Sequence, residues 1–211
     1  VLRPELRYTD AGVALLSFTV AAQTREDGGP VYVPVRAVGK LAEAAASALE
    51  GEEVGALVEG RLEVYQEQGR PSRYNVVAER IRPFRVQEED LTPPDAKGGR
   101  RLKGGVSLFV GTGKLARDVE VSRGGSVPFA RGTLAVLWEK GTDFIPFVAF
   151  GPLAERLEGL TKGTSLYLRG RVVHESWTAS DGEKRFGLKV EAEAVRLRED
   201  APRMAGEPIP L

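Results

Sequence analysis

Three short stretches of this sequence each occur twice, at nearly the same spacing. The paired stretches are 38–43 with 150–155, 59–62 with 169–172, and 20–21 with 134–135. Their offsets are 112, 110 and 114 residues, and the second set keeps the order of the first. Because chance rarely produces ordered matches at one spacing, the sequence predicts two copies of one domain of roughly 100 residues.

The stretch between the two copies has the composition of a domain boundary. It contains Pro93-Pro94, Gly98-Gly99 and Gly104-Gly105 among charged residues and has little apolar content. The end of the chain is rich in proline and shows no periodic pattern, which indicates a mobile segment. We therefore expect a first domain at 1–84, a linker at 85–105, a second domain at 106–198 and a flexible tail at 199–211.

Each copy is dominated by the pattern of β-strands. Apolar and polar residues alternate from Leu188 to Ala194, and long strands are expected at 13–22, 31–38, 56–65 and 165–177. Gly60 and Gly170 lie inside strands, where a glycine favours the sharp bend that curls a small sheet into a barrel. One short helix is expected in each copy, at 41–49 and 152–160. The order of elements predicts an all-β chain with two tandem five-stranded barrels of the OB type.

The first copy lacks one expected strand. The second copy opens with an apolar stretch at 106–111, and the equivalent stretch in the first copy would precede Val1. A five-stranded barrel needs this strand for closure, so we expect that the sequence is shortened at this end.

Composition excludes several kinds of chemistry. There is no cysteine and only one histidine, His174, so thiolate catalysis, iron–sulfur clusters and cysteine or histidine-rich metal sites are excluded. Glu191 and Glu193 alternate on one strand face beside Lys189 and are interpreted as a solvated edge, not as an acid/base pair. We expect no enzyme activity, no cofactor, no metal and no membrane span. Few thermolabile residues beside many charges favour a heat-adapted source, although a GC-rich genome gives the same bias.

Several motifs resemble those of bacterial single-stranded DNA-binding proteins. Arg3-Pro4-Glu5-Leu6-Arg7-Tyr8-Thr9, followed by Gly12, resembles the family's R-D-P-E-L-R-Y-T-x-x-G segment. Gly39-Lys40-Leu41-Ala42-Glu43 resembles F-G-K-L-A-E at the start of its helix, and Gly170-Arg171 followed by Trp177 resembles its G-x-L…W hairpin. The layout is similar to the branch whose chains carry two OB folds. The resemblance implies a homodimer that binds and protects single-stranded DNA in replication, recombination and repair, in the cytoplasm and associated with the nucleoid.

The resemblance also implies which residues contact the DNA. Bases are expected to stack on aromatic side chains above a groove lined by cations. The aromatic candidates are Trp138, Phe144, Phe150 and Trp177 in the second copy and Tyr32 in the first. The cationic candidates are Arg171, Lys184, Arg185, Arg36, Arg61 and Arg73. Glu207, Ile209, Pro210 and Leu211 resemble the family's tail tip, which implies docking of replication or repair proteins.

The two copies differ in the features that nucleic-acid binding requires. Residues 1–84 carry 10 Lys+Arg against 12 Asp+Glu and contain 6 aromatic residues, none of them tryptophan. Residues 106–198 carry 14 Lys+Arg against 11 Asp+Glu and contain 9 aromatic residues. The second copy is therefore expected to bind more tightly. The neutral total charge leaves an alternative function open, a protein-interaction or assembly module that has lost most of its DNA groove.

Overall fold

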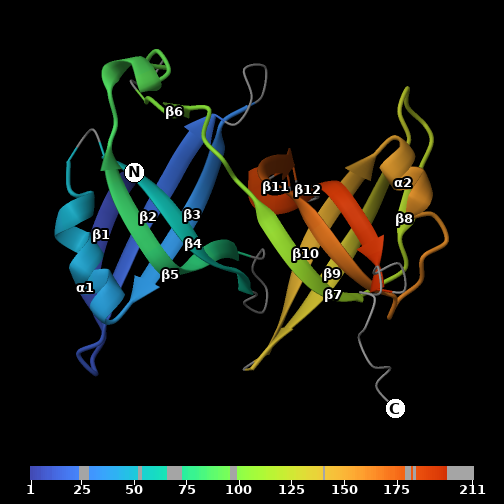
Figure 1. The fold of residues 1–211 in the computed structure, drawn as a ribbon, viewed down its shortest axis with the longest axis horizontal. Helices are drawn as coiled ribbons and strands as arrows, with labels where there is room; N and C mark the ends of the chain where they lie inside the picture. The colour runs from blue at the N-terminus through green and yellow to red at the C-terminus, as the bar shows by residue number, and fades with distance from the viewer. Residues whose placement is uncertain are drawn as a thin grey trace, which may run out of the picture. The chain divides into compact units, whose positions relative to one another are not determined.

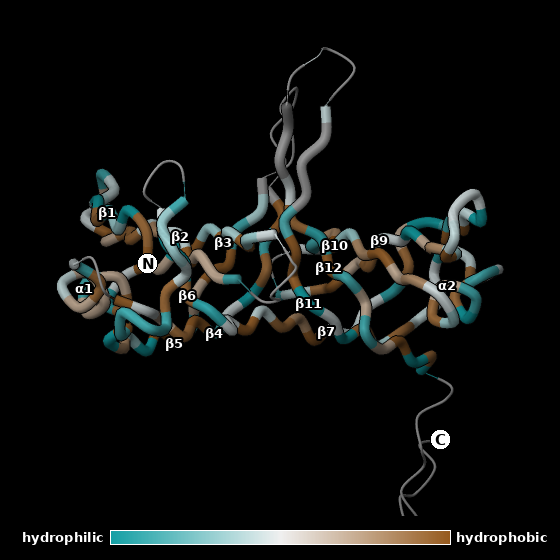
Figure 2. Tube along the Cα trace, turned by 90° about the horizontal axis from the view of Figure 1, so that it is seen from above, coloured by the Kyte–Doolittle hydropathy of each residue, from teal (hydrophilic) through white to brown (hydrophobic). Residues whose placement is uncertain are grey.

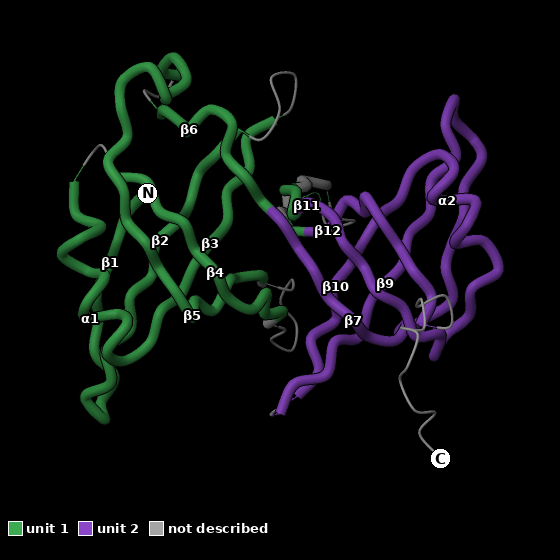
Figure 3. The backbone as a smooth tube through the Cα atoms, viewed as in Figure 1, with its two compact units in different colours: residues 1–107, 172–188 green, residues 108–171, 189–211 purple. Residues whose placement is uncertain are grey.

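The computed structural model describes residues 1–23, 29–51, 54–65, 73–95, 99–139, 141–178, 182 and 184–198, with the side chains at 65, 73, 175–177 and 184–186 left out. The described chain forms two compact units (Figure 3). Unit 1 comprises residues 1–107 and 172–188, and unit 2 comprises residues 108–171 and 189–211. The domain limits expected from composition stay a prediction.

Unit 1 is built around a sheet with the strand order β1-β2-β3-β5-β4 (Figure 1). Its elements are β1 (Leu2–Tyr8), β2 (Ala14–Gln23), β3 (Val31–Val38), helix α1 (Lys40–Ala46), the 3₁₀ turn η1 (Ser47–Leu49), β4 (Val54–Tyr65) and β5 (Arg73–Arg85). The chain continues through the 3₁₀ turn η2 (Glu88–Asp90) and β6 (Leu102–Lys103), which pairs with β2. β3 and β5 run parallel, as do β2 and β6, while the other paired strands of unit 1 run antiparallel.

The core of unit 1 lies between the curled sheet and helix α1. Leu16 and Phe18 of β2, Val35 of β3 and Leu49 of η1 are buried together with the alanines of α1. The helix begins after Gly39, whose φ of +63° is a left-handed conformation that favours glycine. Small alanine side chains allow the helix to approach the strands closely, so the helix expected at 41–49 forms as α1 followed by η1.

Unit 2 is a closed five-stranded barrel with the order β10-β12-β11-β7-β9 and a final pairing of β9 with β10. Its elements are β7 (Phe109–Leu115), β8 (Glu120–Ser122), β9 (Phe129–Trp138), β10 (Gly141–Phe150), α2 (Pro152–Arg156), β11 (Ser165–Thr178) and β12 (Lys184–Leu197), of which the end of β11 and the start of β12, within residues 172–188, belong to unit 1. Leu134, Ile145, Phe147, Leu168 and Val190 fill the barrel. Figure 2 shows polar and apolar residues alternating along the strands, as expected when one side faces a core and the other faces solvent.

Both strand glycines allow a close approach between neighbouring strands. A Cβ atom on Gly60 would lie 2.2 Å from the carbonyl oxygen of Val77, and one on Gly170 would lie 2.2 Å from that of Glu191. The register of β4 against β5 shifts by one residue between Glu59 and Gly60, which is a β-bulge. The two units thus repeat one bend, and the prediction of two tandem OB folds is confirmed.

Candidate nucleic-acid interface

The outer face of β9 and β10 carries two of the aromatic residues that the sequence pointed to. Side chains alternate along β10, so Ile145 and Phe147 face the core while Phe144 and Phe150 face outward with 52% and 50% of their surface exposed. Phe144 lies opposite Ala135 of β9. Because alanine is small, this cross-strand neighbour covers little of the Phe144 side chain.

One end of this face holds an aromatic pair with a cation. Phe129 of β9 lies opposite Phe150, and their ring centroids are 6.4 Å apart at an angle of 39°. The guanidinium carbon of Arg131 lies 5.1 Å from the centroid of the Phe129 ring, within the range of a cation–π contact. Phe129 was not among the predicted site residues. The signal for it is the cross-strand register, which places it opposite Phe150 and cannot be read from either strand alone.

Trp138 lies at the other end of β9 but on the opposite side of the sheet, because side chains alternate along the strand and it shares the side of Leu134 and Val136. It is the last residue of β9, it pairs with Gly141 of β10, and it is an exposed residue. Phe144 and Phe150 are six residues apart on one strand, which is about 20 Å of extended chain. Phe144 and Phe150 therefore lie along one surface, with Phe129 opposite Phe150.

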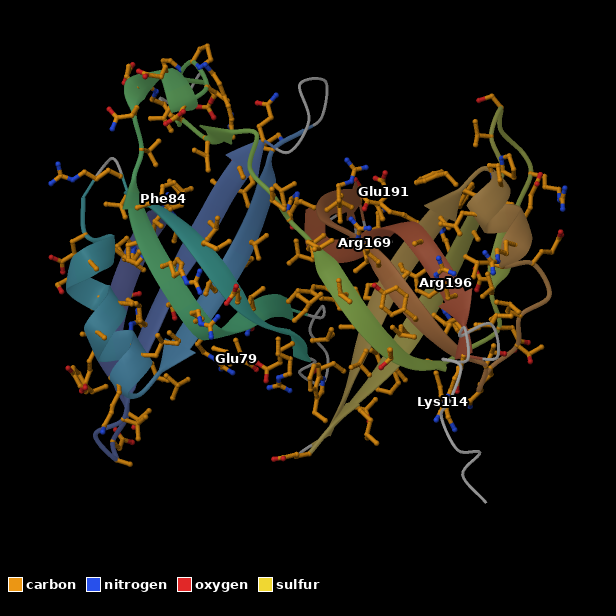
Figure 4. The ribbon with its side chains drawn as sticks, in the orientation of Figure 1. Glu79, Phe84, Lys114, Arg169, Glu191 and Arg196 are labelled. Atoms are coloured by element: carbon orange, nitrogen blue, oxygen red, sulfur yellow. The ribbon has the colours of Figure 1, made fainter. Side chains whose placement is uncertain are left out.

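Paired residues cross this surface from β9 to β12, with charged side chains on either side of the buried Val148. Arg131 pairs with Val148 of β10, and Val148 pairs with Glu191 of β12. Glu191, which Figure 4 labels, accepts at Oε1 a hydrogen bond of 2.7 Å from Nη2 of Arg171 on β11. The Nε atom of Arg171 lies 3.2 Å from Glu193, an ion pair without the geometry of a hydrogen bond.

These contacts correct the interpretation of Glu191 and Glu193 as a solvated edge. Glu191 is half-buried, and both carboxylates are partners of Arg171. Two carboxylates beside one guanidinium attract the cation and hold it against the strand. Arg171 is thus placed on the predicted surface, but it is neutralised by its own chain.

The equivalent surface of unit 1 has the same register and different side chains. Tyr32 lies opposite Ala21, as Phe144 lies opposite Ala135. Val38 lies opposite Leu15, where unit 2 has Phe150 opposite Phe129. The assignment of Tyr32 and Val38 as counterparts of the two phenylalanines therefore rests on strand pairing as well as on sequence.

Tyr32 is covered by the segment that follows β5. The Nε atom of Arg101 donates a hydrogen bond of 2.8 Å to the Tyr32 hydroxyl, and its guanidinium carbon lies 5.7 Å from the ring centroid. Arg101 also forms an ion pair with Asp95. The bond to the Tyr32 oxygen raises the pKa of the guanidinium. The ring of His174 meets Tyr32 edge to face at 6.3 Å, so Tyr32 presents less of its ring than Phe144 does.

Glu63 binds two of the three predicted cations of unit 1, Arg36 and Arg61. Arg36 donates to its carboxylate at 2.8 Å, Arg61 at 3.1 Å and the Asn75 amide at 3.2 Å. Arg61 and Arg171 occupy repeat-equivalent positions, each directly after the glycine of the bend. Both copies therefore hold an arginine at this point with a carboxylate from their own chain.

Several predicted site residues fall outside the described part of the structure. The side chains of Trp177, Lys184, Arg185 and Arg73 are not described, and neither are the tail residues Glu207, Ile209, Pro210 and Leu211. Among the residues that the structure does describe, no group of three or more histidine, aspartate or glutamate side chains could hold a metal ion. No described helix is long and apolar enough to cross a membrane.

Comparisons with known proteins agree with this geometry. Residues 109–198 match the model of the single-strand binding protein family. A single-stranded DNA-binding protein of Thermus thermophilus is 35% identical over 222 residues, which cover 97% of this chain and 83% of the relative. The chain belongs to the single-strand binding protein family.

Other members of this family extend the comparison. The single-stranded DNA-binding protein of Deinococcus radiodurans is 33% identical over 214 residues, covering 91% of this chain and 70% of that protein. The crystal structure of the wild-type single-stranded DNA-binding protein of Thermus aquaticus superposes with a TM-score of 0.72 at 30% identity and covers 97% of this chain. The similarity therefore spans both units.

Proposed function

We propose that this chain binds single-stranded DNA without sequence preference. The observation that carries the proposal is the group of outward-facing aromatic rings on β9 and β10, with Arg131 beside it. Bases of any sequence have a π-face, and stacking on an aromatic side chain contributes about 1–3 kcal/mol per base. Membership of the single-strand binding protein family supports the same function.

The proposal assigns unequal shares to the two units. In unit 2 Phe144 and Phe150 are open to a ligand, whereas in unit 1 the counterpart of Phe144 is covered by Arg101 and the counterpart of Phe150 is a valine. We infer that unit 2 stacks most of the bases. Unit 1 then contributes cations and a continuous path for the strand.

The proposed role is binding and protection of single strands in replication, recombination and repair, in the cytoplasm and near the nucleoid. It includes no enzyme activity and no cofactor. We also propose that the tail residues Glu207, Ile209, Pro210 and Leu211 dock replication or repair proteins, as the resemblance implies. Two chains would pair into a homodimer with four OB folds.

A titration with oligo-dT at low and high salt tests the proposed binding. Stacking should quench the fluorescence of Trp138 and Trp177, and the logarithm of the affinity should fall linearly with the logarithm of the salt concentration as counterions are released. Oligo-dT and oligo-dC should bind alike if sequence is not read. Absence of quenching at low salt would contradict the proposal.

A second candidate is an assembly module without nucleic-acid binding. The observation in its favour is the neutralisation of Arg36, Arg61 and Arg171 by carboxylates of the same chain. The same titration separates the two candidates, because an assembly module would show little affinity at any salt concentration.

A further inference from the structure

The segment that follows η2 in unit 1 forms a small hairpin. Leu91 and Leu102 pair as a bridge, and the main-chain N–H of Thr92 donates a hydrogen bond of 2.8 Å to the carbonyl oxygen of Arg101. The main-chain N–H of Arg101 donates in turn to the Thr92 hydroxyl at 3.1 Å, and Thr92 is buried. We call the described residues of 91–102 the covering hairpin.

Strand pairing anchors the covering hairpin beside Tyr32. Its strand β6 runs parallel to β2, with Leu102 beside Ala22 (Figure 1). Ala21, the preceding residue of β2, lies opposite Tyr32 of β3. This register brings Arg101, the residue before Leu102, to the side of the sheet that carries Tyr32. The small side chain of the cross-strand alanine leaves room there for a guanidinium group.

The guanidinium of Arg101 contacts the Tyr32 side chain in two ways. Its Nε atom donates a hydrogen bond of 2.8 Å to the hydroxyl, and its central carbon lies 5.7 Å from the ring centroid. Cation–π contacts form within about 6 Å of a ring centroid. A base that stacks on an aromatic side chain needs the same ring to be free. The guanidinium and a base therefore compete for Tyr32.

Asp95 of the same hairpin also holds Arg101. Its carboxylate forms an ion pair with the guanidinium, and the main-chain N–H of Gly99 fixes the carboxylate with a hydrogen bond of 2.8 Å to Oδ1. Only 15% of the Arg101 side chain is exposed. Because this cation already has a carboxylate partner, it attracts a phosphate group less than a free arginine does. Its removal should therefore uncover Tyr32 with little loss of attraction for DNA.

Unit 2 shows the uncovered arrangement at the equivalent place. Phe144 lies opposite Ala135 as Tyr32 lies opposite Ala21. Phe144 is 52% exposed, whereas Tyr32 is only half-buried in spite of its hydroxyl group and its cover. The strand register is the same in both units, so the difference lies in what occupies the ring.

Release of Tyr32 requires movement of one side chain only. The main chain of the covering hairpin is held by the bonds between Thr92 and Arg101 and by the pairing of β6 with β2. Arg100 adds two hydrogen bonds of 2.7 Å to Glu88 and one of 3.2 Å to the Thr92 carbonyl. These contacts do not involve Tyr32. The guanidinium of Arg101 can therefore leave the ring while the hairpin keeps its place, which gives unit 1 a covered and an open state.

We propose that Arg101 is an autoinhibitory cover of Tyr32, and that a base stacks on Tyr32 only after the guanidinium has left the ring. This inference rests on the proposed binding of single-stranded DNA and adds a competitor within the chain. The cover lowers the apparent affinity of unit 1 in proportion to the fraction of molecules in the open state. Unit 2 therefore takes up bases at lower DNA concentrations than unit 1 does.

Photocrosslinking of the full chain to oligo-dT that carries 5-iododeoxyuridine measures stacking on each unit. After digestion with trypsin, peptide 26–36 reports on Tyr32, its only aromatic residue, and peptide 141–156 reports on Phe144 and Phe150. Arg101→Ala should raise the crosslink yield of the first peptide relative to the second by about threefold or more, because the open state becomes the dominant one. Absence of crosslinks to both peptides would overturn the proposed DNA binding and the cover with it. A crosslinked second peptide with an unchanged ratio would overturn the cover alone.

Arg100→Ala is the matched control. Arg100 is the neighbouring residue in the covering hairpin, and its guanidinium also pairs with a carboxylate, that of Glu88. Its substitution removes the same charge and loosens the same hairpin but leaves Arg101 on Tyr32, so the crosslink ratio should not change. An equal rise in both variants would overturn the proposal, because loss of charge or a looser hairpin would then explain it.

Asp95→Asn is a second variant, which keeps Arg101 and weakens its hold. The amide oxygen can still accept the hydrogen bond from Gly99, but the ion pair is lost, so the ratio should rise by less than in Arg101→Ala. If Arg101→Ala speeds hydrogen exchange throughout β3, unit 1 has unfolded and Asp95→Asn decides. The cover is overturned if neither variant raises the ratio. It is also overturned if Arg101→Ala lowers the ratio in a folded protein, since Arg101 would then help to hold the DNA.

Discussion

Arg61 and Arg171 each lie on a surface that is proposed to bind DNA, yet the guanidinium group of each already has a partner within the chain. Each follows the glycine of a bend, and each is held by a carboxylate of the same chain. Both pairs are partly buried, with 19–28% of each side chain exposed. A phosphate group would have to displace a carboxylate that already holds the cation, so each pair fixes the position of its arginine and competes with a ligand for it.

The substitution Phe144→Ala should weaken binding of oligo-dT by about 1–3 kcal/mol, which is the contribution of one stacked base. Folding should be nearly unchanged, because the ring is half-exposed and its loss leaves no core cavity. Phe84→Ala is the matched control, since Phe84 is 42% exposed on β5 of unit 1 (Figure 4). Fluorescence titrations of the two variants should differ. Equal losses of affinity would contradict a stacking role for Phe144.

The substitution Tyr32→Phe should have the opposite effect: it should lower stability and leave the affinity for DNA nearly unchanged. It removes the hydroxyl that accepts the hydrogen bond from Arg101, and hydrogen bonds to charged groups contribute about 1.5–3 kcal/mol. The ring itself is kept, so affinity for oligo-dT should hardly change while the unfolding midpoint of unit 1 falls. Chemical denaturation and the DNA titration measure the two effects. Lower affinity with unchanged stability would show that Tyr32 contacts the DNA through its hydroxyl.

Sequence reasoning found part of this residue-level picture. The alternation of β10 separates Phe144 from Phe147, and the structure buries Phe147 and exposes Phe144. The cover over Tyr32 could not be predicted, because Arg101 lies 69 residues away in the chain. Contacts of this kind depend on the path of a connecting segment, and that path has no periodic pattern.

At the scale of elements, local patterns located most strands and both helices. The strand expected at 31–38 forms as β3 (Val31–Val38), and the helix expected at 152–160 shortens to α2 (Pro152–Arg156). The first strand of the second copy was expected at 106–111 and forms at 109–115. Apolar content alone favoured the earlier residues, whereas pairing with β11 selects the later ones. The local sequence pattern predicts that a strand forms, whereas pairing with the neighbouring strand decides at which residues it begins and ends.

Gly60 and Gly170, the glycines at the strand bends, should tolerate substitution poorly. Gly60→Ala would place a Cβ atom 2.2 Å from a main-chain oxygen that cannot move without breaking the β4–β5 pairing. We expect a loss of about 1–3 kcal/mol in the free energy of unfolding, as for other overpacked sites. Gly141→Ala is the control, because no atom lies within 4 Å of its added Cβ. Chemical denaturation should separate the two variants, and equal midpoints would show that the strands can move apart without cost.

At the scale of the whole molecule, a two-copy chain offers two faces to partners. Val110 lies on the outward side of β7, Leu108 directly precedes this strand, and both side chains are more than half exposed. Apolar side chains exposed next to one another on a strand favour association with another surface. A twofold pairing, in which the same patch of each chain meets, is the commonest closed arrangement. The proposed homodimer therefore has a candidate surface on unit 2.

A solution mass of twice the chain mass of 22.8 kDa is expected at micromolar concentration, measured by light scattering on a size-exclusion column. Val110→Glu should reduce it to that of one chain, because a carboxylate buried in an apolar interface without a partner costs several kcal/mol. Val127→Glu is the matched control, since Val127 and Val110 are 49% and 54% exposed and only Val110 lies on β7. A single-chain mass for the unsubstituted protein would contradict the dimer. Equal masses for the two variants would place the interface elsewhere, because the same charge at an equally exposed valine would then have the same effect.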